Sequence, residues 1–272
     1  MKLNHVVHWS LSVILTICTL SAEAAEKDAE IRPLIGINTD IEGNSSLKAS
    51  ISLPYIDAIR KAGGVPILLP PMSAEELASV LPRLDGVMMI GGDDYPPEIY
   101  KQKQHESVSL MKPQRSEFDM MLAKEMLNSK MPMLGICAGC QALNIAAGGD
   151  LIQDIPSSHP ESKVKHRVAN PLKVGYAKHN ADLTAGSKIA NALNTEKLDV
   201  VTSHHQCVGQ AGTNLNVVAK SDDGMVEAIE GAGDRFLVGV QWHPERDFET
   251  NRKLFEVFIK HAALQKQLQQ QK

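Results

Sequence analysis

The sequence predicts an α/β fold with a mostly parallel central sheet, helices on both faces and added antiparallel strands in the C-terminal half. Two observations predict it. In the first half, short apolar runs alternate with stretches whose apolar residues recur at helical spacing, a pattern typical of parallel strands joined by crossover helices. After Asp154 the strand-like runs follow one another with few helices between them. This change indicates antiparallel strands added at the sheet edge.

The first-half strands are recognised as short apolar runs, and the helices between them by their spacing. Apolar side chains recur at helical spacing within residues 55–62 and again within 118–126. The runs that read as buried strands are residues 33–38, 65–69, 87–90 and 133–136.

The second half supplies further strands and a closing helix. Residues 248–264 place Leu254, Phe255, Phe258 and Ile259 on one helical stripe, which indicates packing against the core. The strand-like segments before that helix are residues 172–176, 198–202, 215–219, 225–229 and 236–240.

The composition, and a sequence without repeats or linkers, indicate one catalytic domain over residues 31–264. The chain has 272 residues, of which 43% are hydrophobic and 22% charged, so it is long enough to bury a sizeable core. No repeat or linker interrupts residues 31–264, and we expect residues 265–272 to form a frayed polar tail. The net charge of -4 provides no basic surface for phosphates, which argues against a nucleic-acid partner.

The N-terminus resembles a secretory signal over residues 1–24. A basic start at Lys2 precedes an apolar stretch at 11–20 and a small-residue exit around Ala24. The apolar stretch is shorter than the roughly 20 residues that span a bilayer, so an uncleaved anchor is the weaker alternative. We therefore expect an exported protein, periplasmic or secreted, with no membrane attachment after cleavage. Its three remaining cysteines, an odd number, argue for at least one free thiol.

Cys137 lies between a predicted strand and a predicted helix, with Gly135 and Gly139 on either side. Flanking glycines permit the sharp strand-turn-helix that exposes a nucleophile at the carboxyl edge of a sheet. The start of a helix also favours a thiolate. One alternative is a buried, inert cysteine; another is a redox pair of Cys137 with Cys140. The glycines favour the nucleophile.

A family resemblance appears at these residues. The segment 135–141, Gly-Ile-Cys-Ala-Gly-Cys-Gln, together with Leu143-Asn144 and residues 148–155, resembles the signature of class I glutamine amidotransferases. It is most similar to the γ-glutamyl-GABA hydrolase and γ-glutamyl hydrolase branch, peptidase family C26, over nearly the whole chain after the leader. The resemblance implies a flavodoxin-like sandwich and hydrolysis of γ-glutamyl amides. Ala138 departs from the arginine usual in the bacterial γ-glutamyl-GABA hydrolases.

His243 and Glu245 are the predicted partners of the thiol. A thiolate needs a base that takes and returns a proton, and that base is usually a histidine held by a third group. Residues two apart in an extended segment face the same side, so both side chains reach one site. The segment 238–245, Val-Gly-Val-Gln-Trp-His-Pro-Glu, matches the family motif. A surface pair without a role is the alternative.

The resemblance also implies an oxyanion hole and a substrate pocket. Its donors would be the backbone N–H groups of Gly92 and Ala138, with Gly91 shaping the turn after residues 87–90. Residues 93–114 form an irregular loop that is either a wall of the site or a passive surface loop. The residues expected to border the substrate are Gln141, His205 and Gln206, although Gln141 is as well suited to capping the helix.

The remaining histidines give only a weak case for a metal. His204 and His205 are adjacent, but no further histidine or cysteine lies at ligand spacing in the sequence, so we predict no metal site. His204 is expected to be structural, and His159 and His166 are expected on the surface.

Taken together, these residues predict a cysteine hydrolase that cleaves a small γ-glutamyl amide through a thioester and requires no cofactor. A homodimer is compatible with this activity. One alternative is a glutaminase subunit that supplies ammonia to a synthase, which export disfavours. Another is an exported binding protein without catalysis, which the presence of all three triad residues disfavours.

Overall fold

A nine-stranded sheet forms the centre of the molecule in the computed structural model, which describes residues 32–270. The strand order is β4-β1-β5-β6-β13-β12-β11-β8-β9. The first five of these strands run parallel, namely β4 (Val65–Leu69), β1 (Leu34–Asn38), β5 (Gly86–Met89), β6 (Met133–Ile136) and β13 (Leu237–Val240). The last four are antiparallel, namely β12 (Val226–Gly231), β11 (Leu215–Ser221), β8 (Ala177–Leu183) and β9 (Lys197–Thr202).

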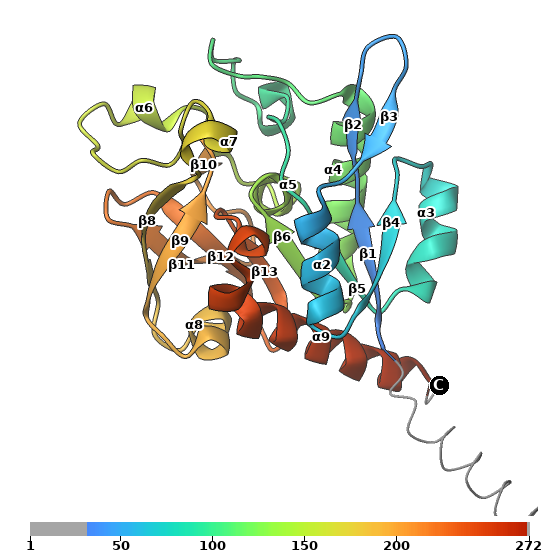
Figure 1. Cartoon of the computed structure of the whole chain (residues 1–272). Helices are drawn as coiled ribbons and strands as arrows, with labels where there is room; N and C mark the ends of the chain where they lie inside the picture. Colours follow the sequence, from blue (N-terminus) through green and yellow to red (C-terminus); the bar gives the residue numbers. More distant parts are fainter. Residues whose placement is uncertain (1–31, 271–272) are drawn as a thin grey trace, which may run out of the picture. The chain divides into compact units, whose positions relative to one another are not determined.

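Helices cover both faces of this sheet, as predicted (Figure 1). One face packs against α2 (Leu53–Lys61), α8 (Lys188–Leu193) and α9 (Phe248–Gln270), and the other against α3 (Ala74–Val80), α4 (Pro113–Asn128) and α5 (Ala138–Ala146). The pleat of β5 divides its side chains between the two cores: Met88 packs on the first face, and Val87 and Met89 pack on the second. The predicted α/β architecture with antiparallel strands in the C-terminal half is confirmed.

Short elements complete the chain between these layers. They are the hairpin β2 (Asp40–Glu42) and β3 (Lys48–Ser50), the pair β7 (Leu151–Ile152) and β10 (Cys207–Val208), the short helices α6 (Ile155–Ser158) and α7 (Pro171–Val174), and the 3-10 turns η1 (Leu81–Arg83), η2 (Pro97–Tyr100) and η3 (Pro244–Asp247).

The strand predicted at residues 172–176 is wrong. Residues Pro171–Val174 form α7, because Pro171 suits the first helical turn and the Asn170 side chain accepts a hydrogen bond from the Lys173 N–H at 3.2 Å. The strand begins later, at Ala177. Its polar centre at Lys178, His179 and Asn180 hides the alternation of buried residues from a search for apolar runs.

The sequence predicts a secretory signal at the N-terminus and a frayed polar tail at the C-terminus. The secretory signal predicted at residues 1–24 lies outside the described residues. Helix α9 runs past residue 264 to Gln270, so the predicted polar tail is helical as far as the structure describes it. Among residues 32–270, no helix is long and apolar enough to cross a membrane.

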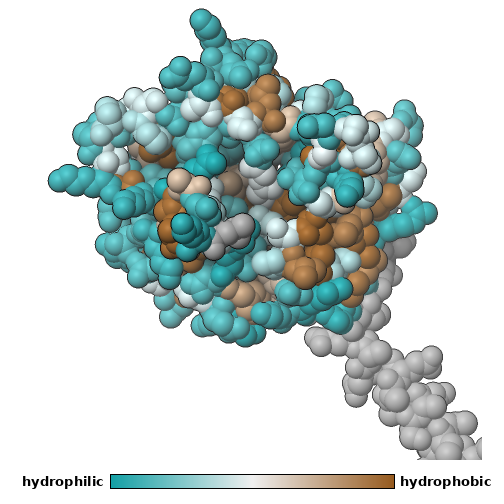
Figure 2. Space-filling model, turned by 45° about the horizontal axis from the view of Figure 1, so that its top comes forward, coloured by the Kyte–Doolittle hydropathy of each residue, from teal (hydrophilic) through white to brown (hydrophobic). Residues whose placement is uncertain are grey.

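The parallel strands bring three predicted segments to one sheet edge. Strand β6 lies between β5 and β13, with Gly135 paired to Met89 on one side and to Gly239 on the other. The turn after β5, the elbow after β6 and the segment after β13 therefore meet at the carboxyl edge, where open α/β sheets place their ligands. Figure 2 brings the top of Figure 1 forward and shows a mostly hydrophilic face with separate apolar patches.

Candidate active site

Cys137 occupies a strained turn between β6 and α5. Its backbone has φ 52° and ψ −108°, a conformation that side chains with a Cβ rarely adopt. The flanking glycines make the turn possible. A Cβ on Gly135 would lie 2.6 Å from the Gly139 carbonyl oxygen, and one on Gly139 would lie 2.3 Å from the Met89 carbonyl oxygen. The Cys137 N–H donates to the Val240 carbonyl at 2.8 Å, which ties the elbow to β13.

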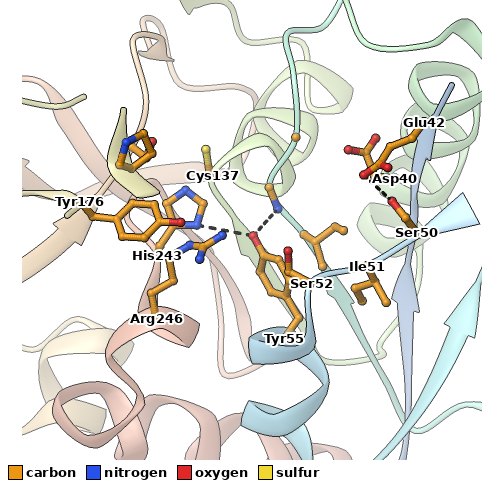
Figure 3. Close-up of a pocket in the computed structure, with 15 residues that line it drawn as sticks. Asp40, Glu42, Ser50, Ile51, Ser52, Tyr55, Cys137, Tyr176, His243 and Arg246 are labelled. Carbon is orange, nitrogen blue, oxygen red and sulfur yellow. Dashed lines mark hydrogen bonds between the residues drawn. The ribbon is translucent and has the colours of Figure 1, made fainter. Parts of the chain in front are cut away.

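His243 lies beside the thiol and is held by Glu245. The Nδ1 of His243 is 2.9 Å from Glu245 Oε1, and the Glu245 side chain is fully buried. Burial alone would lower the pKa of His243, but the charges of Glu245 and Cys137 raise it to about 10. Because Nδ1 is engaged by the carboxylate, Nε2 is the nitrogen available to the Cys137 thiol. The structure therefore brings the three predicted catalytic side chains together, and Figure 3 shows two of them, Cys137 and His243.

Tyr55 of α2 lies near the same imidazole nitrogen that Glu245 engages. Its hydroxyl accepts a hydrogen bond from the Gly91 N–H at 3.2 Å and lies 3.5 Å from His243 Nδ1 (Figure 3). Burial raises the pKa of Tyr55 well above its usual value, and the charges of Glu245 and Cys137 raise it further, so the phenol stays neutral. In the sequence Tyr55 shows only as an apolar residue at helical spacing, which carries no sign of this contact.

The predicted oxyanion donors belong to Ala138, which follows Cys137 directly, and to Gly92, which lines both recesses next to the thiol with Cys137. Among residues 32–270, no protein acceptor contacts the backbone N–H of Gly92 or of Ala138, whereas the Gly91 N–H is occupied by Tyr55. Ala138 is the first residue of α5, where helical N–H groups have no partner within the helix. Two free donors beside a thiol are suited to a developing oxyanion.

A buried polar network fixes the glycine turn that carries Gly92. The Asn38 side chain accepts from the Ile90 N–H at 2.8 Å, and Arg115 donates to the Ile90 carbonyl at 3.2 Å. Asp119 holds both of these side chains, at 2.7 Å from Asn38 Nδ2 and 2.6 Å from Arg115 Nε. Burial alone would lower the pKa of Arg115, but Asp119 raises it. The guanidinium therefore remains charged and keeps the turn in place.

Two recesses meet at Cys137. The larger has a volume of about 370 Å³ and is lined by Tyr55, Tyr176, His243 and Arg246, with Asp40 and Glu42 at its far side (Figure 3). The smaller has a volume of about 180 Å³ and is lined by polar residues that include Asp93, Asp94, Gln141, Arg167 and Gln206. Gly92, Cys137 and Ser203 belong to both. A substrate bound across the thiol would place one part in each recess.

The predicted substrate residues Gln141, His205 and Gln206 all line the smaller recess, and so does the start of the irregular loop at Asp93 and Asp94. Gln141 is buried and donates to the Gln206 carbonyl at 3.4 Å and to Gln241 Oε1 at 3.3 Å. Their contact with substrate stays a prediction. Arg167, which follows a histidine that we expected on the surface, was not singled out by the sequence.

His205 links two loops of this wall. Its Nε2 is 3.1 Å from Asp94 Oδ2, and its Nδ1 is 3.0 Å from Asp154 Oδ1. The hydrogen bond to Asp94 raises the pKa of His205 above its ordinary 6.5. Burial alone would raise the pKa of Asp154, but hydrogen bonds from Ser157 and His205 lower this pKa below the ordinary 3.8. Both ring nitrogens are thus engaged by carboxylates.

We expect this link to stabilise the protein most under mildly acidic conditions. A raised histidine pKa contributes stability below 6.5 that is lost as the pH rises through the folded-state pKa, and a lowered aspartate pKa contributes stability above 3.8 that is lost as the pH falls. His205→Asn should therefore cost about 1 kcal/mol at pH 5.5, or about 2–4 °C in Tm, and much less at pH 9. Thermal unfolding of both proteins across this range measures it. An equal difference at both pH values would contradict the ionic link.

The prediction that His166 lies on the surface is wrong. Its side chain is only 4% exposed, and its ring lies between Asp223 and Glu227. His159 is half-buried. His204 is buried as well, with Nδ1 at 2.9 Å from the Gln206 carbonyl, in keeping with its predicted structural role. Polar neighbours in the sequence concealed the burial of His166, because the groups that enclose it come from distant segments.

Cys140 does not pair with Cys137. Both thiols are free. The Cys140 side chain is fully buried, and its sulfur packs so closely against β13 that a Cβ on Gly239 would lie 2.8 Å from it. Burial raises the pKa of Cys140 well above the usual thiol value, so this thiol is protonated and unreactive. The geometry does not favour the redox-pair alternative.

The fold and this edge of the sheet define a class: an α/β protein of the glutamine amidotransferase type, with a cysteine elbow at the carboxyl edge. A Thermoplasma acidophilum structure, provisionally assigned as a component of GMP synthase, superposes with a TM-score of 0.60, covering 88% of this chain and 98% of that one at 19% identity. This likeness supports the fold.

Sequence comparison gives the family. The Peptidase C26 family matches residues 33–245, and the chain belongs to it. A Mycobacterium tuberculosis protein provisionally assigned as a glutamine amidotransferase is 35% identical over 239 residues, covering 85% of this chain and 75% of its own length. The γ-glutamyl-γ-aminobutyrate hydrolase PuuD of Escherichia coli is 32% identical over 240 residues, covering 84% and 92%. The chain is thus a glutamine amidotransferase-like hydrolase.

Proposed function

We propose that this protein hydrolyses γ-glutamyl amides, with Cys137 as the nucleophile, His243 as the acid and base, and Glu245 as the group that orients His243. The observation that carries the proposal is the position of the Cys137 thiol where the two recesses meet, with His243 beside it in the wall of the larger recess. The raised pKa of His243 supports an imidazolium beside a thiolate, which is the reactive form of such a pair.

The reaction proceeds in two halves. The Cys137 thiolate attacks the γ-carbonyl carbon, and the oxyanion accepts hydrogen bonds from the N–H groups of Gly92 and Ala138. His243 gives its proton to the amide nitrogen as the C–N bond breaks, which releases the amine and leaves a γ-glutamyl thioester. His243 then takes a proton from water, the hydroxide adds to the thioester, and the thiolate leaves to give glutamate.

The smaller recess suits the glutamyl group. A γ-glutamyl substrate carries an α-carboxylate and an α-ammonium group, and this recess offers the guanidinium of Arg167 and the carboxylate of Asp93. Arg167 makes no ion pair within 4 Å of a described acidic residue. We therefore infer that Arg167 binds the α-carboxylate and Asp93 the α-ammonium group, while the amine occupies the larger recess.

Removing the positive charge of Arg167 should weaken substrate binding without unfolding the protein. Loss of a charged hydrogen-bond partner costs about 1.5–3 kcal/mol, so Arg167→Ala should lower kcat/KM by about 10- to 150-fold, mainly through KM. Arg167 is exposed, so Tm should be unchanged. Lys165→Ala, an exposed cation two residues away in the same loop, is the matched control. Steady-state kinetics that give Arg167→Ala the same KM as this control would exclude the assignment.

A substrate panel tests the function itself. We expect glutamate release from γ-glutamyl-GABA and small γ-glutamyl peptides, and none from the α-glutamyl isomers, whose scissile carbonyl lies elsewhere relative to the charged groups. Glutamine tests the alternative of a glutaminase subunit: its ammonia leaving group would make no use of the larger recess, so it should be the poorer substrate. Efficient turnover of glutamine alone would favour the glutaminase, and no turnover of any amide would refute the proposal.

A further inference from the structure

Four side chains converge in a cluster beside the smaller recess. His166 comes from the loop between α6 and α7, His179 from β8, His204 from the loop after β9, and Glu227 from β12. One nitrogen or oxygen atom from each lies within 4.8 Å of all the others. Each side chain is at most 5% exposed. None of these residues belongs to the proposed catalytic group.

The atoms that face one another in this cluster have no hydrogen-bond partner. Within the described chain, this is true of His166 Nδ1, His179 Nε2, His204 Nε2 and both carboxylate oxygens of Glu227. Buried polar atoms are almost always satisfied, and a group of five unsatisfied atoms around one point therefore requires an explanation.

The far side of each histidine ring is satisfied. His166 Nε2 lies 3.0 Å from Asp223 Oδ2, His179 Nδ1 lies 3.0 Å from the Asn180 carbonyl, and His204 Nδ1 lies 2.9 Å from the Gln206 carbonyl. These partners are acceptors, so each ring donates outward, and a neutral ring then turns a bare nitrogen lone pair toward Glu227. An outward N–H held by an oxygen acceptor is the usual support of a metal-binding histidine.

The distances from Glu227 to the three histidines match a tetrahedral site, within a cluster whose ligand atoms all lie within 4.8 Å of one another. Glu227 Oε1 is 3.4 Å from His166 Nδ1, 3.3 Å from His179 Nε2 and 3.6 Å from His204 Nε2. An ion with bonds of about 2.0–2.1 Å to four tetrahedral ligands separates those ligands by about 3.3–3.4 Å. We propose that His166, His179, His204 and Glu227 bind one Zn²⁺ ion as a closed structural site.

Charge agrees with this ligand set. Two positive charges on the ion would balance the carboxylates of Glu227 and of Asp223, which supports His166 from outside. Four protein ligands complete tetrahedral coordination, so the ion would hold structure and leave no position for substrate.

The ion would hold the wall of the smaller recess. It would join strands β8 and β12 to the two loops that carry His166 and His204. These two loops are already linked, because the backbone N–H of His204 donates to the backbone carbonyl of His166 at 2.9 Å. His205 and Gln206, which line the recess, follow His204 directly, and Arg167 follows His166. Ligand spacing along the sequence does not reveal this cluster, because its four members come from four separate segments.

Metal content of the full chain, independent of its activity, tests the proposal. Protein purified without chelator should contain about one zinc per chain. A strong chelator should remove the ion and lower Tm, and added Zn²⁺ should restore it. Co²⁺ added to the metal-free protein should give the strong visible absorption of a tetrahedral site. A wild-type protein that holds no zinc after reconstitution and gives no tetrahedral Co²⁺ spectrum would overturn the proposal, leaving a protonated cluster instead.

Variants assign the ligands. Glu227→Gln and His179→Gln should each weaken Zn²⁺ binding by at least about 10-fold. His105→Gln, which replaces a histidine outside the cluster, should retain about one zinc per chain. Equal zinc affinity in the two cluster variants and in His105→Gln would show that the ion binds elsewhere. The measurements on the wild-type protein decide the question even if a cluster variant fails to fold.

Discussion

Cys137→Ala should lower kcat/KM for γ-glutamyl-GABA by at least about 10⁴-fold, the scale seen when a covalent nucleophile is removed from an enzyme of this mechanistic type. The expectation follows from the position of the thiol, which lies next to the His243 imidazole and borders both recesses. Glutamate release measured with purified proteins checks it, and mass spectrometry of the wild-type protein under turnover should detect a γ-glutamyl adduct on Cys137.

The matched control for this loss is Cys140→Ala. This second thiol is fully buried in the core beneath the elbow and lies outside both recesses. We expect its removal to change Tm more than it changes kcat/KM. If Cys137→Ala retained wild-type activity, or if only Cys140→Ala abolished it, the assigned nucleophile would be wrong.

Glu245→Gln should lower kcat by about 10²–10⁴-fold while leaving KM nearly unchanged. The amide would keep the shape of the carboxylate but would donate its N–H to His243 Nδ1, which would leave the proton on Nε2. An imidazole in that tautomer has no lone pair directed at the Cys137 thiol. The loss of the negative charge would also lower the pKa of His243, since Glu245 is the strongest of the groups that raise it.

The pH dependence of kcat/KM separates this effect from general damage. In Glu245→Gln, the part of the kcat/KM profile between acidic and neutral pH should shift along the pH axis. A protein that is only destabilised would lose activity equally at every pH. Glu249→Gln serves as the control, because this exposed carboxylate lies one turn further along and, within residues 32–270, pairs only with Arg252. A Glu245→Gln enzyme with wild-type kcat would show that the carboxylate does not orient His243.

The sequence predicted the part of the site whose geometry is local. The elbow at Cys137 and the pair His243 and Glu245 each lie within a few residues of a strand end, and parallel strands deliver their carboxyl ends to one edge. The α/β order was predictable for the same reason, since it depends on periodicity within short windows. The strand predicted at 172–176 was wrong because Asn170 and Pro171 start a helical turn there.

The remaining features depend on contacts between distant segments. Asn38, Arg115 and Asp119 meet below the glycine turn from elements that are up to 81 residues apart. No short motif marks them. Likewise, His166 looks like one polar residue among many, and its burial beside Glu227 becomes apparent only once β8 and β12 are placed in the sheet.

The backbone of Cys137 has a consequence beyond catalysis. At φ 52° and ψ −108°, glycine is the residue that the main chain would accept with least penalty, so the cysteine is retained against a conformational cost of about 1–3 kcal/mol. Random mutation under selection for thermal resistance alone would drift toward glycine at this position and would remove the proposed nucleophile.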